Sequence, residues 1–241
     1  MRIAAISDFH IGATGQSDCF RHDLRAFHSY LDGLEEGHDR IVLLGDIFQA
    51  EYGPWLGRRT EAQQLATAQR RVPCLWRRFQ GSAYDYLHGN HDAVASSTCG
   101  ARTDMRIAAD GFAAYFIHGH QFDPLQVRAY PLARVSTWLT GRMRRLGAAP
   151  IADWLEHQDV AIKHRKFQGA SGPYALAASD LLRAQKVDVV VMGHTHIPQR
   201  CELEAGVYAN TGTCSHGNRM AVSIDTVRRT VECLRESPKR P

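Results

Sequence analysis

The chain has 241 residues, 44% of them hydrophobic and 22% charged, so it can bury one sizeable core, and we expect one domain over residues 1–241. The formal net charge of +4 is modest, and no apolar run approaches the roughly 20 residues of a membrane span. Because the first residues lead straight into a strand pattern, we expect no signal peptide. The six cysteines form no C-x-x-C pair, which is typical of reduced thiols in the cytoplasm.

The first half of the chain alternates between short apolar runs and segments with apolar residues at helical spacing. This alternation predicts strand–helix–strand units, as in an α/β fold. In chain order we expect a strand at 3–6, a helix at 19–34, a strand at 41–44, a helix at 61–79 that Pro73 breaks or kinks, a strand at 83–87, and a hairpin of strands 105–108 and 112–117 around Asp110-Gly111.

The β pattern disappears between residues 122 and 186, where we predict a helical insertion of two to four helices, the last near 174–185. Segment 121–186 has ten basic and five acidic residues, a net charge of +5, so the basic excess of the chain lies there. It is either a solvated helical face or a surface for an anionic substrate or anionic lipid. After it we expect strands at 187–192, 201–203, 207–210, 220–224 and 230–234 and a frayed tail at 237–241.

Five strings place metal-binding side chains directly after predicted strands. In open α/β sheets, sites form beyond the carboxyl ends of the strands, so donors from distant parts of the chain are expected to meet in one crevice. Two adjacent metal ions suit attack on phosphate esters. The strings are Ser7-Asp8-Phe9-His10, Gly45-Asp46, Gly89-Asn90-His91-Asp92, His118-Gly119-His120 and Gly193-His194-Thr195-His196.

The two carboxylate strings are ambiguous when each is taken alone. Asp8 with His10 offers an oxygen and a nitrogen ligand, but an Asp after a strand also forms turns. Asp46 could cap a helix, or its two oxygens could bridge two cations. Their shared placement after strands favours the metal interpretation.

Gly89-Asn90-His91-Asp92 offers an amide oxygen ligand, a general acid and a carboxylate that could hold the imidazole. The alternative is an ordinary Asn-His turn. We therefore predict Asn90 as a ligand, His91 as the proton donor, and Asp92 as the residue that orients His91.

Among the histidine strings, Gly193-His194-Thr195-His196 is the most informative. Alternate residues of an extended segment point to opposite sides, so both imidazoles can face the site only across a turn, which Gly193 permits. The alternative is a surface histidine pair. His118 directly follows a strand and is predicted as a ligand, whereas His120 either touches substrate or stabilises its loop.

Taken together and in this order, the strings resemble the calcineurin-like metallophosphoesterase superfamily, from Met1 to about Leu234. The resemblance implies two facing β-sheets flanked by helices, an αββα sandwich, here with the insertion at 122–186 as a lid or cap. It also implies hydrolysis of a phosphomonoester, phosphodiester or pyrophosphate by a hydroxide that bridges two metals. One metal would take Asp8, His10 and His196, the other Asn90, His118 and His194, and Asp46 would bridge both.

The mixed nitrogen and oxygen donor set suits Mn²⁺, Fe, Co²⁺ or Zn²⁺ better than Ca²⁺, and the sequence does not choose among them. We expect two divalent transition metal ions, with Mn²⁺ favoured and Fe, Zn²⁺, Co²⁺ or Ni²⁺ as the alternatives. Within the superfamily, the outline resembles the UDP-2,3-diacylglucosamine pyrophosphatases, whose G-D-x-F-E stretch is similar to the segment Gly45–Gln49 and whose insertion caps a site for acyl chains. This chain departs from that branch at His91, where the branch has Arg, at His120, where it has Asp, and at Gln49, where it has Glu. Apolar residues of the insertion could line such a site or pack onto the core: Leu125, Val127, Tyr130, Leu132, Val135, Trp138, Leu139, Trp154 and Leu155.

These features predict a small phosphate ester or a lipid-linked nucleotide as substrate, in the cytoplasm or at the inner face of the membrane, with peripheral membrane contact through the basic insertion. The alternatives are a nucleotide phosphodiesterase or nuclease of the same superfamily and a non-catalytic metal-binding scaffold. We do not expect a nucleic-acid partner, because the sequence offers no aromatic stacking platform.

Overall fold

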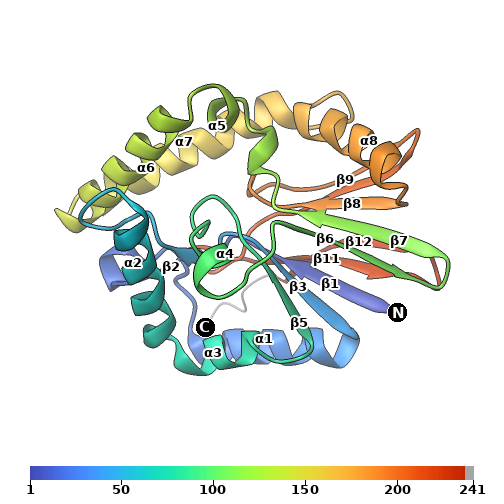
Figure 1. The fold of residues 1–241 in the computed structure, drawn as a ribbon, viewed down its shortest axis with the longest axis horizontal. Helices are drawn as coiled ribbons and strands as arrows, with labels where there is room; N and C mark the ends of the chain where they lie inside the picture. The colour runs from blue at the N-terminus through green and yellow to red at the C-terminus, as the bar shows by residue number, and fades with distance from the viewer. Residues whose placement is uncertain (237–241) are drawn as a thin grey trace.

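Two five-stranded sheets face each other at the centre of the molecule (Figure 1). The computed structural model describes residues 1–236, apart from the side chains of residues 125, 163 and 165–167. The first sheet has the order β12-β11-β1-β3-β5, and the second has the order β6-β7-β8-β10-β9. Their strands are β1 (Arg2–Ile6), β3 (Arg40–Leu44), β5 (Tyr84–Leu87), β6 (Asp104–Ala109), β7 (Phe112–Ile117), β8 (Val189–Met192), β9 (Pro198–Leu203), β10 (Gly206–Thr211), β11 (Arg219–Asp225) and β12 (Thr230–Glu236).

Alternating side chains of the strands fill separate core layers. Ile3 and Ala5 of β1 pack between the two sheets against residues such as Val191 of β8, whereas Ala4 and Ile6 face the opposite side. That outer side is covered by α1 (Leu24–Gly37), α2 (Arg58–Arg71) and α3 (Pro73–Phe79). The outer face of the second sheet is covered by α8 (Pro173–Gln185). The result is helix–sheet–sheet–helix layering, and the predicted fold class is confirmed.

The strands that precede the five strings run parallel to their neighbours. In the first sheet β1, β3 and β5 are parallel, and in the second β7 and β8 are parallel. Because parallel strands end at the same edge, the five following loops meet at one end of the sandwich. Two short strands beyond β1 and β3, β2 (Ile11–Gly12) and β4 (Phe48–Gln49), pair with each other and hold the first two loops together.

Most predicted elements are present, with boundaries set by local chemistry. The first helix begins at Leu24 rather than near residue 19, because the Asp23 carboxylate accepts a hydrogen bond from the Ala26 N–H at 2.8 Å and caps it. The predicted break at Pro73 separates α2 from α3, and Pro73 opens α3, where it needs no N–H. The short helix α4 (Ala95–Thr98) and the 3₁₀ turns η1 (Gly15–Ser17) and η2 (His120–Phe122) were not predicted. The predicted tail at 237–241 lies outside the described residues.

The helical insertion divides into two parts (Figure 1). α5 (Pro124–Arg128), α6 (Tyr130–Arg145) and α7 (Ala149–Phe167) extend across one end of the molecule, with α6 and α7 packed together; we call these the cap helices. α8 instead packs on β8 and β10 as part of the sandwich. The insertion boundaries at 122–186 stay a prediction. Among the described residues, no helix is long and apolar enough to cross a bilayer.

Candidate metal centre

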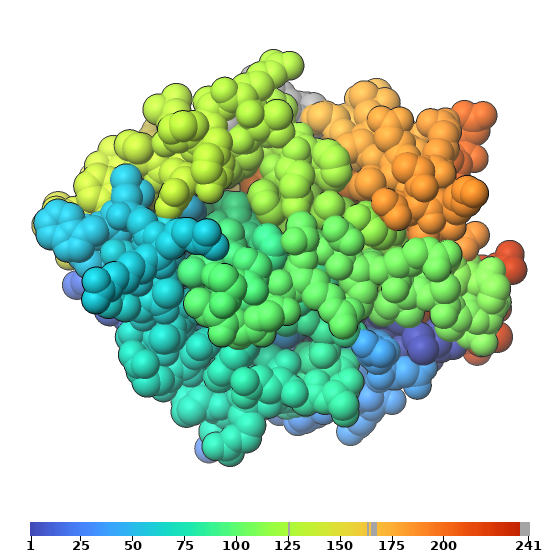
Figure 2. Space-filling model, in the orientation of Figure 1, coloured from blue at the N-terminus to red at the C-terminus, as the bar shows by residue number. Residues whose placement is uncertain are grey.

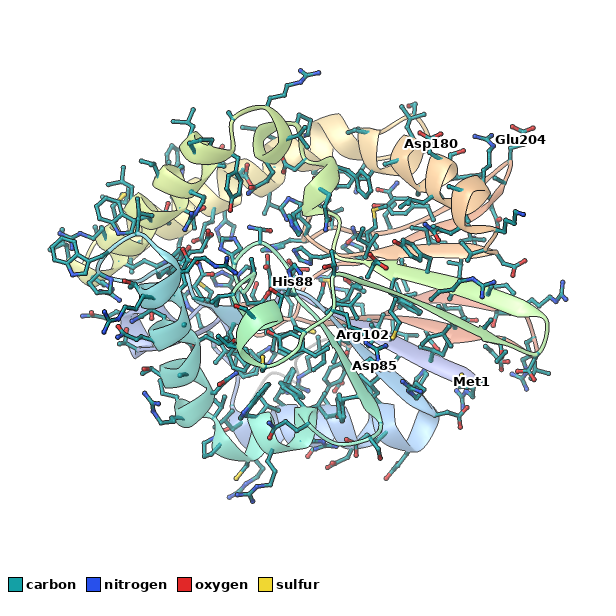
Figure 3. All side chains as sticks on the ribbon, in the orientation of Figure 1. Met1, Asp85, His88, Arg102, Asp180 and Glu204 are labelled. Atoms are coloured by element: carbon teal, nitrogen blue, oxygen red, sulfur yellow. The ribbon has the colours of Figure 1, made fainter. Side chains whose placement is uncertain are left out.

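The strand ends bring the predicted donors together in overlapping groups. Asp8, His10 and His196 place one possible ligand atom each within 4.8 Å of one another. Asp46, His118 and His194 form a second such group, and His10, Asp46 and His91 form a third. Asp46 therefore belongs to two groups, which is the arrangement that a bridging carboxylate requires. Figure 3 labels His88 near the centre of the view; it directly follows β5 and marks the carboxyl end of that strand.

The backbone at these donors is unusual. Asp8, His10, Asp46, His194 and His196 all have positive φ, between 53° and 66°. Residues other than glycine rarely adopt this left-handed conformation, and such strain gathers at functional sites. Each loop thus turns sharply at the donor, which directs its side chain back over the strand ends.

The turn in the last string is made by the histidines themselves. Both histidines are left-handed, whereas Gly193, which we expected to permit the turn, is not among the residues with positive φ. Gly193 is required for a different reason: a Cβ there would lie 2.5 Å from the Ser7 Oγ and 2.8 Å from the Asp8 Oδ2. Because Gly193 has no side chain, the end of β8 can approach the loop after β1, and this brings His194 and His196 close to Asp8 and His10.

Asp8 contacts histidines from the other sheet. Its Oδ1 lies 3.1 Å from the His196 Nε2, and its Oδ2 accepts a hydrogen bond from the His194 N–H at 3.0 Å. Burial alone would raise the pKa of Asp8, but His196 and His118 lower this pKa to about 2. The Nε2 atoms of His10 and His196 face each other at 3.1 Å. Two imidazole nitrogens and a carboxylate oxygen converge here, as ligands of one cation do.

His118 is oriented toward Asp46 by the main chain. Its Nδ1–H donates to the Leu44 carbonyl at 2.8 Å, which leaves Nε2 to face the Asp46 Oδ2 at 3.1 Å. Orientation of one ring nitrogen by a carbonyl is the usual support for a ligating histidine. Burial disfavours the imidazolium, but the Asp46 carboxylate raises the pKa of His118 to about 9. Burial likewise opposes ionisation of Asp46, yet His118 and His91 hold its pKa well below the usual range.

Several donor atoms lack hydrogen bonds although they are buried. Among the described residues these include Asp8 Oδ1, Asn90 Oδ1 and His118 Nε2. Buried polar atoms normally find partners, so a cluster of unsatisfied oxygen and nitrogen donors calls for an explanation. A divalent transition metal is a partner that satisfies a mixed carboxylate, amide and imidazole set.

One expectation from the third string is wrong. Asp92 does not hold the His91 imidazole, because its oxygens already accept hydrogen bonds from five donors: the N–H groups of Asp46, Ile47, Phe48 and Gly89 and the Tyr86 hydroxyl. Asp92 therefore fastens the second and third loops to each other. The His91 Nδ1 lies instead 3.2 Å from the Oε2 of Glu51, which no motif singled out.

Two further positions complete the surroundings of the site. His120 packs beside His118 and His194, with ring centroids 5.5 and 6.3 Å away, and its role as a substrate contact stays a prediction. Burial and these two histidines lower the pKa of His120 to about 2. Asp123 was not predicted, although it closely follows the H-G-H string; its Oδ2 accepts a hydrogen bond from the His194 Nε2 at 3.0 Å.

A cavity of about 720 Å³ extends from the donors to the cap helices. The face of α6 that lines it carries Ser136, Thr137 and Thr140, and no Lys or Arg is among the described lining residues. Most of the apolar residues of the insertion, which we expected to line an acyl-chain site or to pack onto the core, do neither. Seven of them are exposed on the surface, and only Leu155 of these lines the cavity: Val127, Tyr130, Leu132, Val135, Leu139, Trp154 and Leu155.

One more donor group lies on the cavity wall. Cys19, Glu156 and His216 place possible ligand atoms within 4.8 Å. However, Glu156 accepts hydrogen bonds from the Tyr52 hydroxyl at 2.8 Å and from the buried Arg144 at 2.7 Å. A guanidinium beside the carboxylate opposes a second cation there, so we assign this group to the attachment of the cap helices.

Comparison with known proteins places these features in context. The family model for calcineurin-like phosphoesterases matches residues 1–198. Among curated relatives, the UDP-2,3-diacylglucosamine hydrolase of Shewanella halifaxensis (strain HAW-EB4) is 24% identical over 218 residues, which cover 86% of this chain and 87% of that protein. The enzyme of the same name from Marinobacter nauticus (strain ATCC 700491 / DSM 11845 / VT8) is 29% identical over 217 residues, with 83% and 82% covered.

Solved structures agree at the level of the fold. The hypothetical protein PH1004 from Pyrococcus horikoshii OT3 superposes with a TM-score of 0.52 at 9% identity, over 99% of this chain and 89% of that one. This likeness supports the sandwich architecture and carries no information on activity.

Proposed function

The chain belongs to the calcineurin-like phosphoesterase family, and from this premise we propose that it is a hydrolase that cleaves a phosphoester or phosphoanhydride bond with a pair of divalent cations. The observation that carries the proposal is the position of Asp46. Its carboxylate is buried and belongs to two overlapping groups of donor atoms, which come from loops of both sheets. A site for one cation would not need such a shared carboxylate.

The residues divide between two cations. Asp8, His10 and His196 would hold one, Asn90, His118 and His194 the other, and Asp46 would contact both. Mn²⁺ is our first choice, and Fe, Zn²⁺, Co²⁺ and Ni²⁺ suit the same donors. When bound, the cations supply Lewis acidity toward the phosphate oxygens and toward the attacking water. His91 lines the cavity beside them and would donate a proton to the leaving group.

For the substrate, the relatives favour a lipid-linked nucleotide, because proteins named UDP-2,3-diacylglucosamine hydrolase match more than four fifths of the chain. The cavity supports a ligand larger than a simple phosphate. It argues against a nuclease, since a nucleic-acid backbone requires Lys or Arg along its path and the described lining has none.

A substrate panel tests this function. The protein loaded with Mn²⁺ is assayed with UDP-2,3-diacylglucosamine, a nucleoside diphosphate sugar, a cyclic nucleotide and bis-(4-nitrophenyl) phosphate, each with and without a chelator. We expect chelator-sensitive release of UMP from the lipid-linked substrate. Turnover of the cyclic nucleotide alone would make the protein a nucleotide phosphodiesterase. No turnover by the fully loaded protein would leave a metal-binding scaffold and refute the hydrolase.

Peripheral contact with an anionic membrane surface is part of the same proposal. The exposed apolar side chains of α6 include Leu132, Val135 and Leu139, which recur at helical spacing on one face, beside the hydroxyl-bearing face that lines the cavity. No acidic residue occurs between Asp123 and Asp153. The charged residues of α6 itself are therefore all basic, and a helix with an apolar face and basic residues is typical of helices that lie in the interface of an anionic bilayer. The residues of α6, drawn in yellow-green, form the upper left of the face shown in Figure 2.

A further inference from the structure

Glu51 lies in a fixed position between the metal centre and the cap. It follows β4 two residues after Gln49, and only 12% of its side chain is exposed. The loop that carries it is joined to the third string, because the Ala50 N–H donates to the His91 carbonyl at 3.1 Å. This hydrogen bond holds the two loops side by side, and the side chains of Glu51 and His91 meet across it.

The two oxygens of Glu51 face different partners. Oε2 lies 3.2 Å from the His91 Nδ1, and Oε1 lies 3.6 Å from the Nε of Arg134 on α6. Arg134 forms a second ion pair with Glu61 of α2. The carboxylate is thus held on one side by a cap residue and presents its other oxygen to the imidazole. A carboxylate at one ring nitrogen sets the tautomer and directs the opposite nitrogen outward.

We propose that Glu51 is the positioning residue of His91: its carboxylate, 3.2 Å from Nδ1, takes a hydrogen bond from the Nδ1–H in the reacting enzyme and thereby aims Nε2 at the leaving group. Asp92, the neighbour from which this role was expected, is occupied by five other donors. The inference rests on the proposed function, because a leaving group exists only if the protein is a hydrolase. It adds a residue outside the five strings.

The proton balance of the step is simple. The bond between phosphorus and the leaving oxygen breaks, with its electron pair on the oxygen, and this oxygen takes the Nε2 proton of His91. Water supplies the hydroxyl group that forms the new bond to phosphorus. The remaining proton of that water restores His91. Glu51 keeps its charge throughout and exchanges no proton.

Kinetics with paired leaving groups tests the role. Good leaving groups need little proton transfer, so Glu51→Gln should lower kcat by about 10- to 100-fold for an alkyl ester and by less than about 3-fold for the matching 4-nitrophenyl ester, with KM nearly unchanged. Glu51→Asp keeps a charge for Arg134 but shortens the reach to His91, and it should show the same selective loss. The double variant with His91→Ala should be no slower than His91→Ala alone, because the two residues act as one unit.

Glu61→Gln is the matched control. It removes the other carboxylate partner of Arg134 and leaves the pair of Glu51 and His91 in place. Its kcat should stay within about 2-fold of the wild type for both esters. Equal losses for both leaving groups in Glu51→Gln, or additive losses in the double variant, would overturn the proposal.

A spectroscopic readout needs no turnover and so separates this inference from the proposed function. In ¹⁵N imidazole spectra of the zinc-loaded or metal-free protein, His91 should show a protected Nδ1–H signal, assigned by its loss in His91→Ala. The signal should persist in Glu61→Gln and be lost in Glu51→Gln and Glu51→Asp. An unchanged signal in both Glu51 variants would refute the positioning role, even for an active enzyme. A lost signal in a protein that hydrolyses nothing would refute only the hydrolase.

Discussion

Asp46 is the residue on which both halves of the candidate centre depend, since it is the carboxylate shared by two donor groups. Asp46→Asn removes the charge that two cations would share, so we predict loss of bound metal together with a fall in turnover of at least about 100-fold. Metal content by mass spectrometry and activity with the best substrate of the panel measure both. Full activity in this variant would show that the carboxylate does not bridge.

Asp92 and His91 are neighbours with opposite expected phenotypes. Asp92 accepts five hydrogen bonds in the core, and an asparagine would turn an NH₂ group toward some of these donors. Asp92→Asn should therefore lower the free energy of unfolding by about 2–3 kcal/mol. His91→Ala should change it by less than about 1 kcal/mol while it slows turnover of poor leaving groups. Urea unfolding of both variants checks the contrast, and an equally stable Asp92→Asn would contradict the bracing role.

For individual residues, the sequence predicted the metal-binding side chains better than the side chains that contact them. The predicted ligands Asp8, Asp46, Asn90, His118 and His194 stand out in the sequence because each lies one to three residues after an apolar run. The partners of His91 and His194 could not, because Glu51 and Asp123 belong to no local pattern and reach the site only through the tertiary fold. The positive φ angles of the donors were equally unreadable, since they result from the packing of the loops.

Among the elements, the packing of α6 against the rest of the protein can be tested by adding a single methyl group. Gly141 of α6 lies against Tyr52: an added Cβ would be 2.8 Å from the ring and 2.9 Å from the Tyr52 Cα. Gly141→Ala should push α6 outward, destabilise the protein by about 1–3 kcal/mol, and raise KM by widening the cavity. Gly33→Ala in α1 is the control, because nothing lies within 4 Å of its added Cβ, and higher helix propensity should stabilise it by up to about 1 kcal/mol. Equal effects of both variants would show that α6 is loosely seated.

Helices and strands were predictable from periodicity, but the orientation of the cap was not. Apolar residues at helical spacing in α6 indicate a stripe, and we expected this stripe to face a lipid chamber or the core. In the structure Leu132, Val135 and Leu139 are exposed, and hydroxyl side chains face the cavity. Periodicity identifies an amphipathic helix but does not say which face meets the protein. Polar pairs to the body of the protein supply the attachment that an apolar stripe would otherwise provide: Arg134 with Glu61, Asp153 with Arg21, and Glu156 with the Tyr52 hydroxyl.

For the whole molecule, the distribution of exposed apolar side chains predicts where it meets a surface. Most of the large exposed ones lie on the cap helices or in the adjoining loop that carries Trp55, whereas Leu24, Leu176 and Val227 lie elsewhere. We predict that the protein sediments with vesicles that contain phosphatidylglycerol and not with pure phosphatidylcholine vesicles, because both apolar insertion and attraction to anionic lipid are needed.

Two double variants, each replacing two exposed apolar residues by Asp, decide between contact with a membrane and contact with a protein partner. Leu132→Asp with Leu139→Asp places two charges on the apolar stripe and should reduce vesicle binding by at least about 10-fold. Leu176→Asp with Val227→Asp makes the same change on side chains that are equally exposed, and it should leave binding within about 2-fold. Sedimentation equilibrium run in parallel measures self-association. The membrane proposal is wrong if the wild type does not bind anionic vesicles and instead forms a dimer that only the first variant disrupts. The apolar stripe would then be a contact between two copies of the protein.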